Sequence, residues 1–68
     1  MFEQVKEILA KYTEAEITED SKLEADLGLS SLDMVSIVTD FEDAFGIEIS
    51  DRDLRNFVSV GDITSFLR

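Results

Sequence analysis

The segment from Ser31 to Phe45 carries the apolar spacing of a helix with one buried face, and this pattern constrains the fold more than any other. Its apolar residues recur at positions i, i+3, i+4, i+7 and i+11, which are Met34, Ile37, Val38, Phe41 and Phe45. Ser30 directly before the segment is a good N-cap, and Gly46 directly after it is a typical helix stop. Because a helix has to cover its apolar stripe with other elements, the rest of this short chain has to pack against the segment.

Three other segments have helical features and are expected to provide that cover. Residues 2–12 predict a helix because their apolar side chains are spaced 3, 3, 1 and 3 residues apart, at Phe2, Val5, Ile8, Leu9 and Tyr12. Residues 51–57 predict a short helix, and the neighbouring apolar side chains expected to face inward are Leu54, Phe57 and Val58. Ser59, followed three residues later by Asp62, predicts the start of a last helix. The inward-facing residues of that helix are expected to be Ile63, Phe66 and Leu67.

The stretch between the first two predicted helices, residues 13–29, has no sustained apolar period and is rich in turn-forming residues. We expect a long loop that is pinned to the core by three apolar anchors, Ile17, Leu23 and Leu27. Ile47 and Ile49 alternate with polar residues, which we interpret as an extended connection with two anchoring side chains. The sequence thus predicts one all-α domain over residues 1–68, a four-helix bundle with a long first loop and a short third helix.

The composition excludes several kinds of site and partner. The 68 residues include no cysteine and no histidine, so disulfides, thiolate metal ligands and a Ser-His-Asp triad are excluded. An enzyme is the least expected class, and no metal site is expected. Sixteen acidic residues against six basic ones give a net charge of −10, which repels nucleic acid and anionic membranes and attracts basic protein surfaces. With no apolar run that could span a bilayer and no leader-like segment after Met1, we expect a cytoplasmic protein, with an organellar protein whose leader has been removed as the alternative. The starting Met1 favours a free-standing protein, and we expect a monomer.

Two adjacent serines, Ser30 and Ser31, stand where the long loop ends and the second predicted helix begins. The free N–H groups and the positive dipole end of a helix N-terminus favour an anion, so a phosphate ester on one of these hydroxyls would be stabilised there. Gly28 allows the chain to bend tightly before the helix. On the two serines alone, an ordinary helix cap is the simpler interpretation.

The residues around these serines resemble the attachment motif of acyl carrier proteins. Asp26-Leu27-Gly28 is followed, after two residues, by Ser31-Leu32-Asp33, and the likeness covers nearly the whole chain, including the Glu-Ile-Ser-Asp stretch at 48–51. In that family the serine before the leucine carries 4′-phosphopantetheine, and the matching position here is Ser31. The resemblance implies a non-enzymatic carrier that holds acyl groups as thioesters and presents them to fatty-acid or polyketide-type synthase enzymes. The implied partners are a phosphopantetheinyl transferase, which takes the arm from coenzyme A, and synthase or acyl-transferring enzymes with basic docking patches.

Two surfaces are expected on this interpretation. A partner-facing surface around the second helix would consist of Leu32, Asp33, Val35, Ser36, Thr39, Asp40, Glu42, Asp43 and Glu48. An acyl pocket between the helices would be lined by Leu23, Phe41, Ile49, Leu54, Phe57 and Ile63. Because Phe41 and Phe57 are bulky, we predict a shallow pocket suited to short or polar cargo. Without the motif, the same residues would be interpreted as a solvated helix face and an ordinary core.

The chain departs from the family pattern at a few positions. Ser30 stands where aspartate is usual, and Ser36 stands where glutamate is frequent. Thr39 replaces a bulkier apolar residue, and Ser50 replaces a frequent proline. Because the first three lie on or near the partner-facing surface, they leave room for a specialised pathway rather than a generic bacterial fatty-acid carrier.

Alternatives stay open at this point. The chain could carry aminoacyl or D-alanyl groups, or be a domain of a larger synthase. An acidic interaction module with no prosthetic group would need the acidic face but not Ser31. A calcium loop at Asp51 and Asp53 is disfavoured, because Arg55 stands where a third ligand belongs and the turn glycine is missing.

Overall fold

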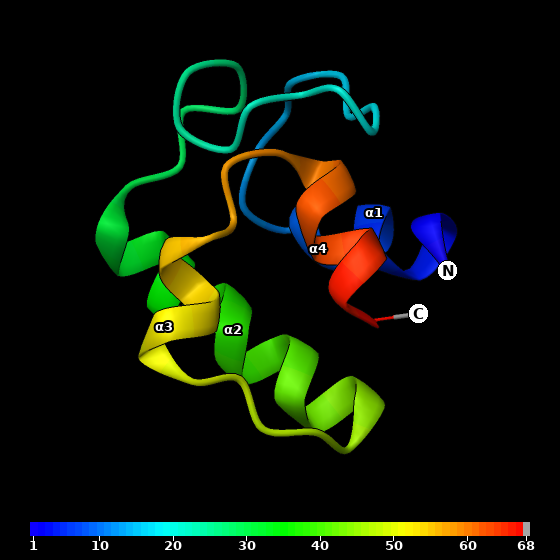
Figure 1. The fold of residues 1–68 in the computed structure, drawn as a ribbon. Helices are drawn as coiled ribbons and strands as arrows, with labels where there is room; N and C mark the ends of the chain where they lie inside the picture. Colours follow the sequence, from blue (N-terminus) through cyan, green and yellow to red (C-terminus); the bar gives the residue numbers. More distant parts are fainter. Residues whose placement is uncertain (68) are drawn as a thin grey trace.

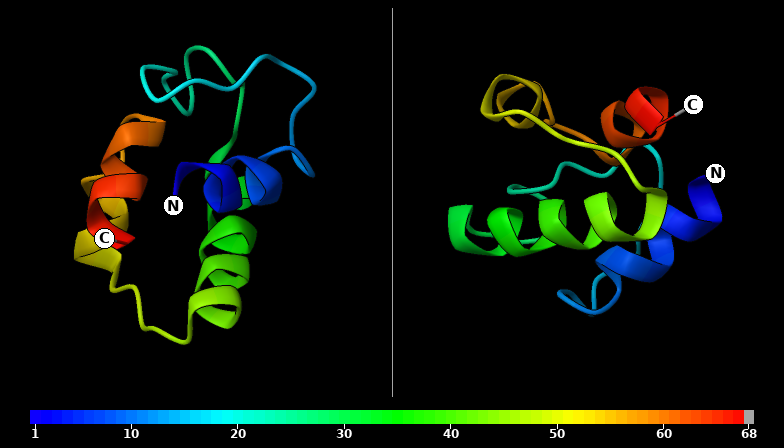
Figure 2. Two further views of the ribbon diagram at one scale, coloured as in Figure 1. Left: turned by 90° about the vertical axis from the view of Figure 1, so that its right-hand side faces the viewer. Right: turned by 90° about the horizontal axis from the view of Figure 1, so that it is seen from below.

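The computed structural model describes residues 1–67, in which four helices form the fold. They are α1 (Phe2–Leu9), α2 (Ser31–Phe45), α3 (Asp51–Arg55) and α4 (Val60–Leu67). α1 packs against both α2 and α4, while α3 and α4 follow one another on the side of the molecule opposite α2 (Figure 2). The predicted all-α fold with a long first loop and a short third helix is confirmed. Arg68, which the predicted domain includes, lies outside the described residues.

The bounds of α2 are set by local interactions at both of its ends. Ser30 Oγ accepts a hydrogen bond from the Asp33 N–H at 3.2 Å, and the Asp33 carboxylate accepts one from the Ser30 N–H at 3.0 Å. This reciprocal pair is a capping box, which satisfies two backbone donors that a helix start leaves free. At the other end, Gly46 has a φ of 65°, a left-handed conformation that favours glycine, and its N–H donates to the Glu42 carbonyl at 2.9 Å. The predicted bounds of this helix are therefore confirmed.

The last two helices begin with the same Ser-Xaa-Xaa-Asp arrangement. Ser50 and Asp53 form a capping box at α3, and Ser59 and Asp62 exchange the equivalent hydrogen bonds before α4. The Asp62 carboxylate also accepts a hydrogen bond from the Val58 N–H at 2.9 Å. The backbone N–H groups of Ser59 and then Val58 hold the pKa of Asp62 below its usual value.

Replacing Asp62 with asparagine is expected to lower stability at neutral pH and to have little effect in acid. A carboxyl group whose pKa is lowered by folding stabilises the protein above its unfolded pKa of about 4, and this stabilisation is lost as the pH falls through the folded pKa. From the cost of losing a helix cap, we expect a loss of about 0.5–1 kcal/mol at pH 7 that shrinks toward zero near pH 2. Urea unfolding at pH 7 and near pH 2 measures this loss of stability. Asp20→Asn is the control, because Asp20 is exposed and the substitution changes the charge by the same amount. An equal loss in both variants at pH 7 would contradict a specific capping role.

The core lies where α1, α2 and α4 meet. Its fully buried apolar residues are Val5, Leu9, Ile37, Phe41, Val60 and Ile63. The loop of residues 10–30 arches over one end of the molecule (Figure 1) and adds four buried side chains to this core, Ile17, Leu23, Leu27 and Leu29. The first three are the predicted anchors, and their burial confirms that expectation.

Backbone hydrogen bonds hold this loop against the start of α4. The N–H of Leu23 donates to the Val58 carbonyl at 2.9 Å, and the N–H of Val60 donates to the Ser21 carbonyl at 3.0 Å. An isolated β-bridge between Lys22 and Ser59 lies between these two bonds. The loop is therefore a fixed part of the fold, and it holds Leu23 beside the segment that connects α3 to α4.

Four details of the sequence prediction were wrong. α1 ends at Leu9 rather than Tyr12, because residues 10–12 continue in turns. α3 ends at Arg55 rather than at residue 57. Val58 was expected to face inward but is 58% exposed, because its N–H and carbonyl are both bonded within the chain and hold its side chain outward. Phe66 is 38% exposed, and it packs edge-on against Phe57 with ring centroids 5.4 Å apart.

Candidate functional site

Ser31 is the first residue of α2, and its side chain is exposed. The neighbouring Ser30 uses its hydroxyl oxygen as the helix cap. Among residues 1–67, by contrast, the Ser31 hydroxyl has no hydrogen-bond partner. Esterification of Ser31 would therefore leave the cap of α2 in place, whereas esterification of Ser30 would involve the oxygen that caps the helix.

The backbone around Ser31 favours a negative group attached to this side chain. The first N–H groups of a helix have no partner in the preceding turn, and the aligned peptide dipoles place partial positive charge there. Asp33 is the acidic residue of this first turn, and its carboxylate is turned back onto the Ser30 N–H. A phosphodiester on the Ser31 hydroxyl therefore suits this position, and the residues present fit a phosphopantetheine group.

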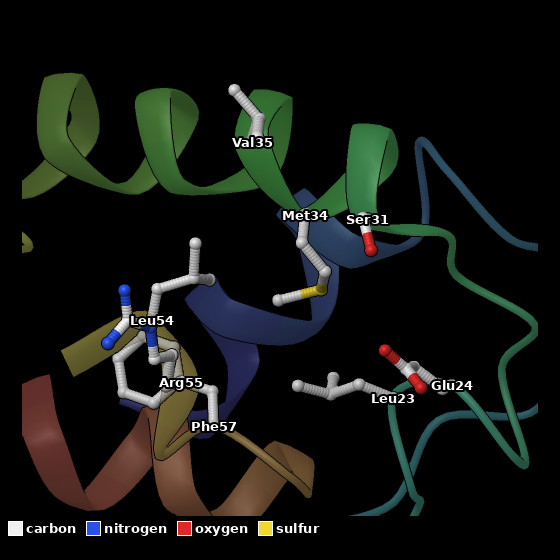
Figure 3. A pocket seen from close by; sticks show the side chains of 8 residues that line it. All are labelled: Leu23, Glu24, Ser31, Met34, Val35, Leu54, Arg55 and Phe57. Carbon is white, nitrogen blue, oxygen red and sulfur yellow. The ribbon is translucent and has the colours of Figure 1, made fainter. Parts of the chain in front are cut away.

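A cleft of about 310 Å³ opens directly beside Ser31, between α2, α3 and the loop (Figure 3). Its lining residues are Leu23, Glu24, Ser31, Met34, Val35, Leu54, Arg55 and Phe57. Three residues of the predicted acyl pocket, Leu23, Leu54 and Phe57, are among them. The other three, Phe41, Ile49 and Ile63, are buried in the core and do not line this cleft.

The sequence interpretation missed several side chains of this cleft. Met34 lies one helical turn after Ser31, so its place at the cleft could have been inferred from the i, i+3 spacing. Glu24 and Arg55 are exposed charged residues on the loop and on α3, and no periodic pattern distinguishes them. Val35 was expected to face a partner, and it is 57% exposed while also lining the cleft.

Part of the expected partner-facing surface is open to solvent. Leu32 is 81% exposed, which is unusual for a large apolar side chain so close to the site. The polar members of the surface with exposed side chains are Ser36, Thr39, Asp43 and Glu48. Leu32 and Val35 thus form an exposed apolar pair beside Ser31, with polar and acidic residues farther along α2.

The remaining acids of the expected surface have partners within the fold. Asp33 belongs to the capping box, and Glu42 accepts a hydrogen bond from the Ile49 N–H at 2.8 Å. Asp40 accepts a hydrogen bond from the Tyr12 hydroxyl and lies 3.6 Å from the Lys11 ammonium. This hydrogen bond, and then burial, raise the pKa of Tyr12 above its usual value. These three acids have partners within the fold, so fewer carboxylates of α2 are free than the sequence implied.

Residues 3–67 match the family model described as the phosphopantetheine attachment site. The chain is 43% identical, over 70 aligned positions, to the acyl carrier protein of Thermotoga maritima, with 98% of this chain and 86% of that protein covered. It also matches the solved structure of a candidate acyl carrier protein from Mycobacterium tuberculosis with a TM-score of 0.87 and 35% identity, covering 94% of this chain and 89% of that one. The chain therefore belongs to the phosphopantetheine-attachment family of acyl carrier proteins, which carry acyl groups and are not enzymes.

Proposed function

We propose that Ser31 is the residue to which the phosphopantetheine arm is attached, within a single carrier domain spanning residues 1–68. The observation that carries this proposal is the free Ser31 hydroxyl at the start of α2, at the edge of a mainly apolar cleft. The neighbouring Ser30 hydroxyl is already engaged as the helix cap. The arm supplies the thiol that a chain without cysteine lacks, and acyl groups are held on it as thioesters.

Attachment would be a phosphoryl transfer from coenzyme A that this chain itself does not catalyse. The Ser31 oxygen attacks the phosphorus next to the pantetheine, the P–O bond to the nucleotide breaks, and adenosine 3′,5′-bisphosphate leaves. A base on the transferase takes the hydroxyl proton. This chain contributes an exposed nucleophile and a helix N-terminus that favours the resulting phosphodiester charge.

We further propose that the loaded chain works as a cytoplasmic monomer that serves fatty-acid or polyketide-type synthase enzymes. Leu32 and Val35 offer apolar contact next to the arm, and Asp43 and Glu48 offer exposed negative charge. A basic docking patch on a partner enzyme would complement this surface and speed the encounter without making the complex long-lived. Within residues 1–67, no helix combines the length and apolar character needed to cross a bilayer.

The test of Ser31 is intact-protein mass spectrometry after incubation with coenzyme A and a promiscuous phosphopantetheinyl transferase. The wild-type chain is expected to gain the mass of one phosphopantetheine group, and Ser31→Ala is expected to gain none. Ser30→Asp is the matched control, because aspartate removes the neighbouring hydroxyl while remaining a good N-cap. Circular dichroism of all three chains checks that the helices are retained.

Two outcomes would overturn this assignment. If the wild type stays unmodified while a known carrier is loaded in the same reaction, the chain is not a substrate for phosphopantetheine transfer. If Ser31→Ala is loaded and Ser30→Asp is not, the attachment residue is Ser30.

A further inference from the structure

We propose that the Ser30 hydroxyl has a second role besides capping α2: it donates a hydrogen bond to the phosphodiester that joins the arm to Ser31. The inference rests on the proposed attachment at Ser31 and adds a positioning residue to it. It implies that loading the arm stabilises the folded chain, and that the side chain at position 30 sets the size of this effect.

The Ser30 hydroxyl uses only its acceptor capacity within the fold. Its oxygen accepts a hydrogen bond from the Asp33 N–H at 3.2 Å. A hydroxyl can donate one hydrogen bond while it accepts another, and among residues 1–67 the Ser30 hydroxyl proton has no acceptor. Because accepting a bond polarises the O–H group, the capping interaction makes this proton a better donor. The cap therefore leaves a donor available directly beside Ser31.

Two backbone donors lie at the same end of α2 as this hydroxyl. The N–H groups of Ser31 and Leu32 have no acceptor among residues 1–67, and the N–H groups of a first turn point toward the start of the helix. The Ser30 oxygen lies at this end too, because it is bonded to the third N–H of the turn, that of Asp33. The Cα–Cβ bonds of a helix are tilted toward its N-terminus, so Ser31 directs a group on its side chain to these donors. Their number suits a phosphodiester, which has two unesterified oxygens to accept hydrogen bonds.

The charged residues around Ser31 make these uncharged donors important. Asp33 lies in the same helical turn, and Glu24 is exposed and lines the cleft beside Ser31 (Figure 3). Both carboxylates repel a negative group on Ser31. No residue of α2 is basic, and Arg55 lies across the cleft on α3 (Figure 3). Hydrogen-bond donors at the helix end, rather than a nearby cation, are therefore what stabilises a phosphodiester at this position.

The proposal separates the hydroxyl proton of residue 30 from its capping oxygen. Serine, threonine and aspartate are all good N-caps, since each has a side-chain oxygen for the free N–H groups of the first turn. Threonine keeps the hydroxyl proton, whereas an ionised aspartate has none and adds a third negative charge. Glycine is an adequate N-cap with neither a side-chain proton nor a charge. Substitution of Ser30 by these three residues therefore distinguishes the donor from the cap.

The test compares the unfolding temperatures of the unloaded and loaded forms of each chain. Loading uses coenzyme A and the transferase, and intact mass shows that it is complete. We expect loading to raise the unfolding temperature of the wild type by about 1–8 °C, the shift for an anion at a helix N-terminus in a domain of this size. Ser30→Thr should keep this rise, and Ser30→Gly should lose about half of it. Ser30→Asp should abolish or reverse the rise, because a carboxylate then faces the phosphodiester.

Phosphorus NMR of the loaded chains gives a readout that cap strength alone does not move. The resonances of the wild type and Ser30→Thr should agree, and that of Ser30→Gly should lie closer to the resonance of the loaded chain unfolded in urea. Ser50→Gly is the matched control, because Ser50 forms the same capping box with Asp53 at the start of α3. This variant weakens a cap away from the arm, so its rise on loading and its phosphorus resonance should match those of the wild type.

The inference is overturned if the rise on loading and the phosphorus resonance are the same in the wild type, Ser30→Gly and Ser30→Asp. It is also overturned if Ser30→Thr behaves like Ser30→Gly, since the hydroxyl proton would then have no effect. Either result, obtained with chains fully loaded at Ser31, leaves the attachment proposal intact. A wild type that gains no phosphopantetheine mass overturns both proposals, and the mass spectrum shows this before any unfolding is measured.

Discussion

Phe41→Ala is expected to lower the free energy of unfolding by about 3–5 kcal/mol, the cost of removing a fully buried aromatic side chain. Phe41 lies in the middle of α2 with no exposed surface, and its ring stacks on Phe45 with centroids 6.1 Å apart. A domain this small has few other core residues that can fill the space left by the ring. Since small domains are stable by only about 5–15 kcal/mol, this loss should leave a large fraction of the protein unfolded at modest urea concentrations.

Urea unfolding followed by circular dichroism measures this loss, with Phe66→Ala as the matched control. Phe66 is also an aromatic residue in a helix, but it is 38% exposed, so its removal should cost clearly less. Phe41→Leu should recover most of the stability because it leaves a smaller cavity. Similar losses for Phe41→Ala and Phe66→Ala would contradict the placement of Phe41 at the centre of the core.

The second large effect is a rise in thermal stability with salt. The net charge is −10, and the ion pair found among residues 1–67 joins Lys11 to Asp40, so repulsion between acids dominates. At about 0.01 M salt the Debye length of about 30 Å exceeds the longest dimension of the molecule, 26 Å, so the acidic residues repel one another across the whole molecule. At about 1 M salt the Debye length falls to about 3 Å, and the repulsion between exposed acids is largely screened. We expect the free energy of unfolding to rise by about 1 kcal/mol or more, which shifts the unfolding temperature by about 4–8 °C.

Scanning calorimetry in increasing sodium chloride measures this rise. A variant with both Glu14→Gln and Glu16→Gln provides the control, because these exposed loop residues lose two negative charges without loss of buried contacts. The variant should be more stable than the wild type at low salt and should gain less from added salt. A salt response of the same size in both chains would show that ion-specific effects, and not charge repulsion, are responsible.

The sequence predicted those parts of the structure that depend on neighbouring residues. The bounds of α2 were right because its start and stop are local: Ser30 and Asp33 form the capping box, and Gly46 takes the left-handed conformation. The ends of α1 and α3 were placed too far along the chain, because no comparably strong stop follows Leu9 or Arg55. Apolar spacing continues past both ends, and spacing alone does not show where backbone hydrogen bonding changes from helix to turn.

The motif likewise identified the carrier family and the residue proposed for attachment, because its signal lies within eight consecutive residues, 26–33. The periodic pattern also identified a buried face correctly. It did not show which buried side chains would reach the cleft: Phe41, Ile49 and Ile63 fill the core, while Met34 lines the cleft instead. That distinction depends on how helices far apart in the sequence are packed together.

Tertiary structure alone decided which charges are free. Asp40 and Glu42 were expected on the partner-facing surface, but Tyr12, which is 28 residues from Asp40, and the Ile49 N–H, in the segment after α2, bind their carboxylates. Arg55 gave no signal in the sequence, and only the fold places it at the cleft that Ser31 also lines. Caps, stops and motifs are determined by residues a few positions apart, whereas a cleft and its charges are determined by contacts between segments that only the folded chain brings together.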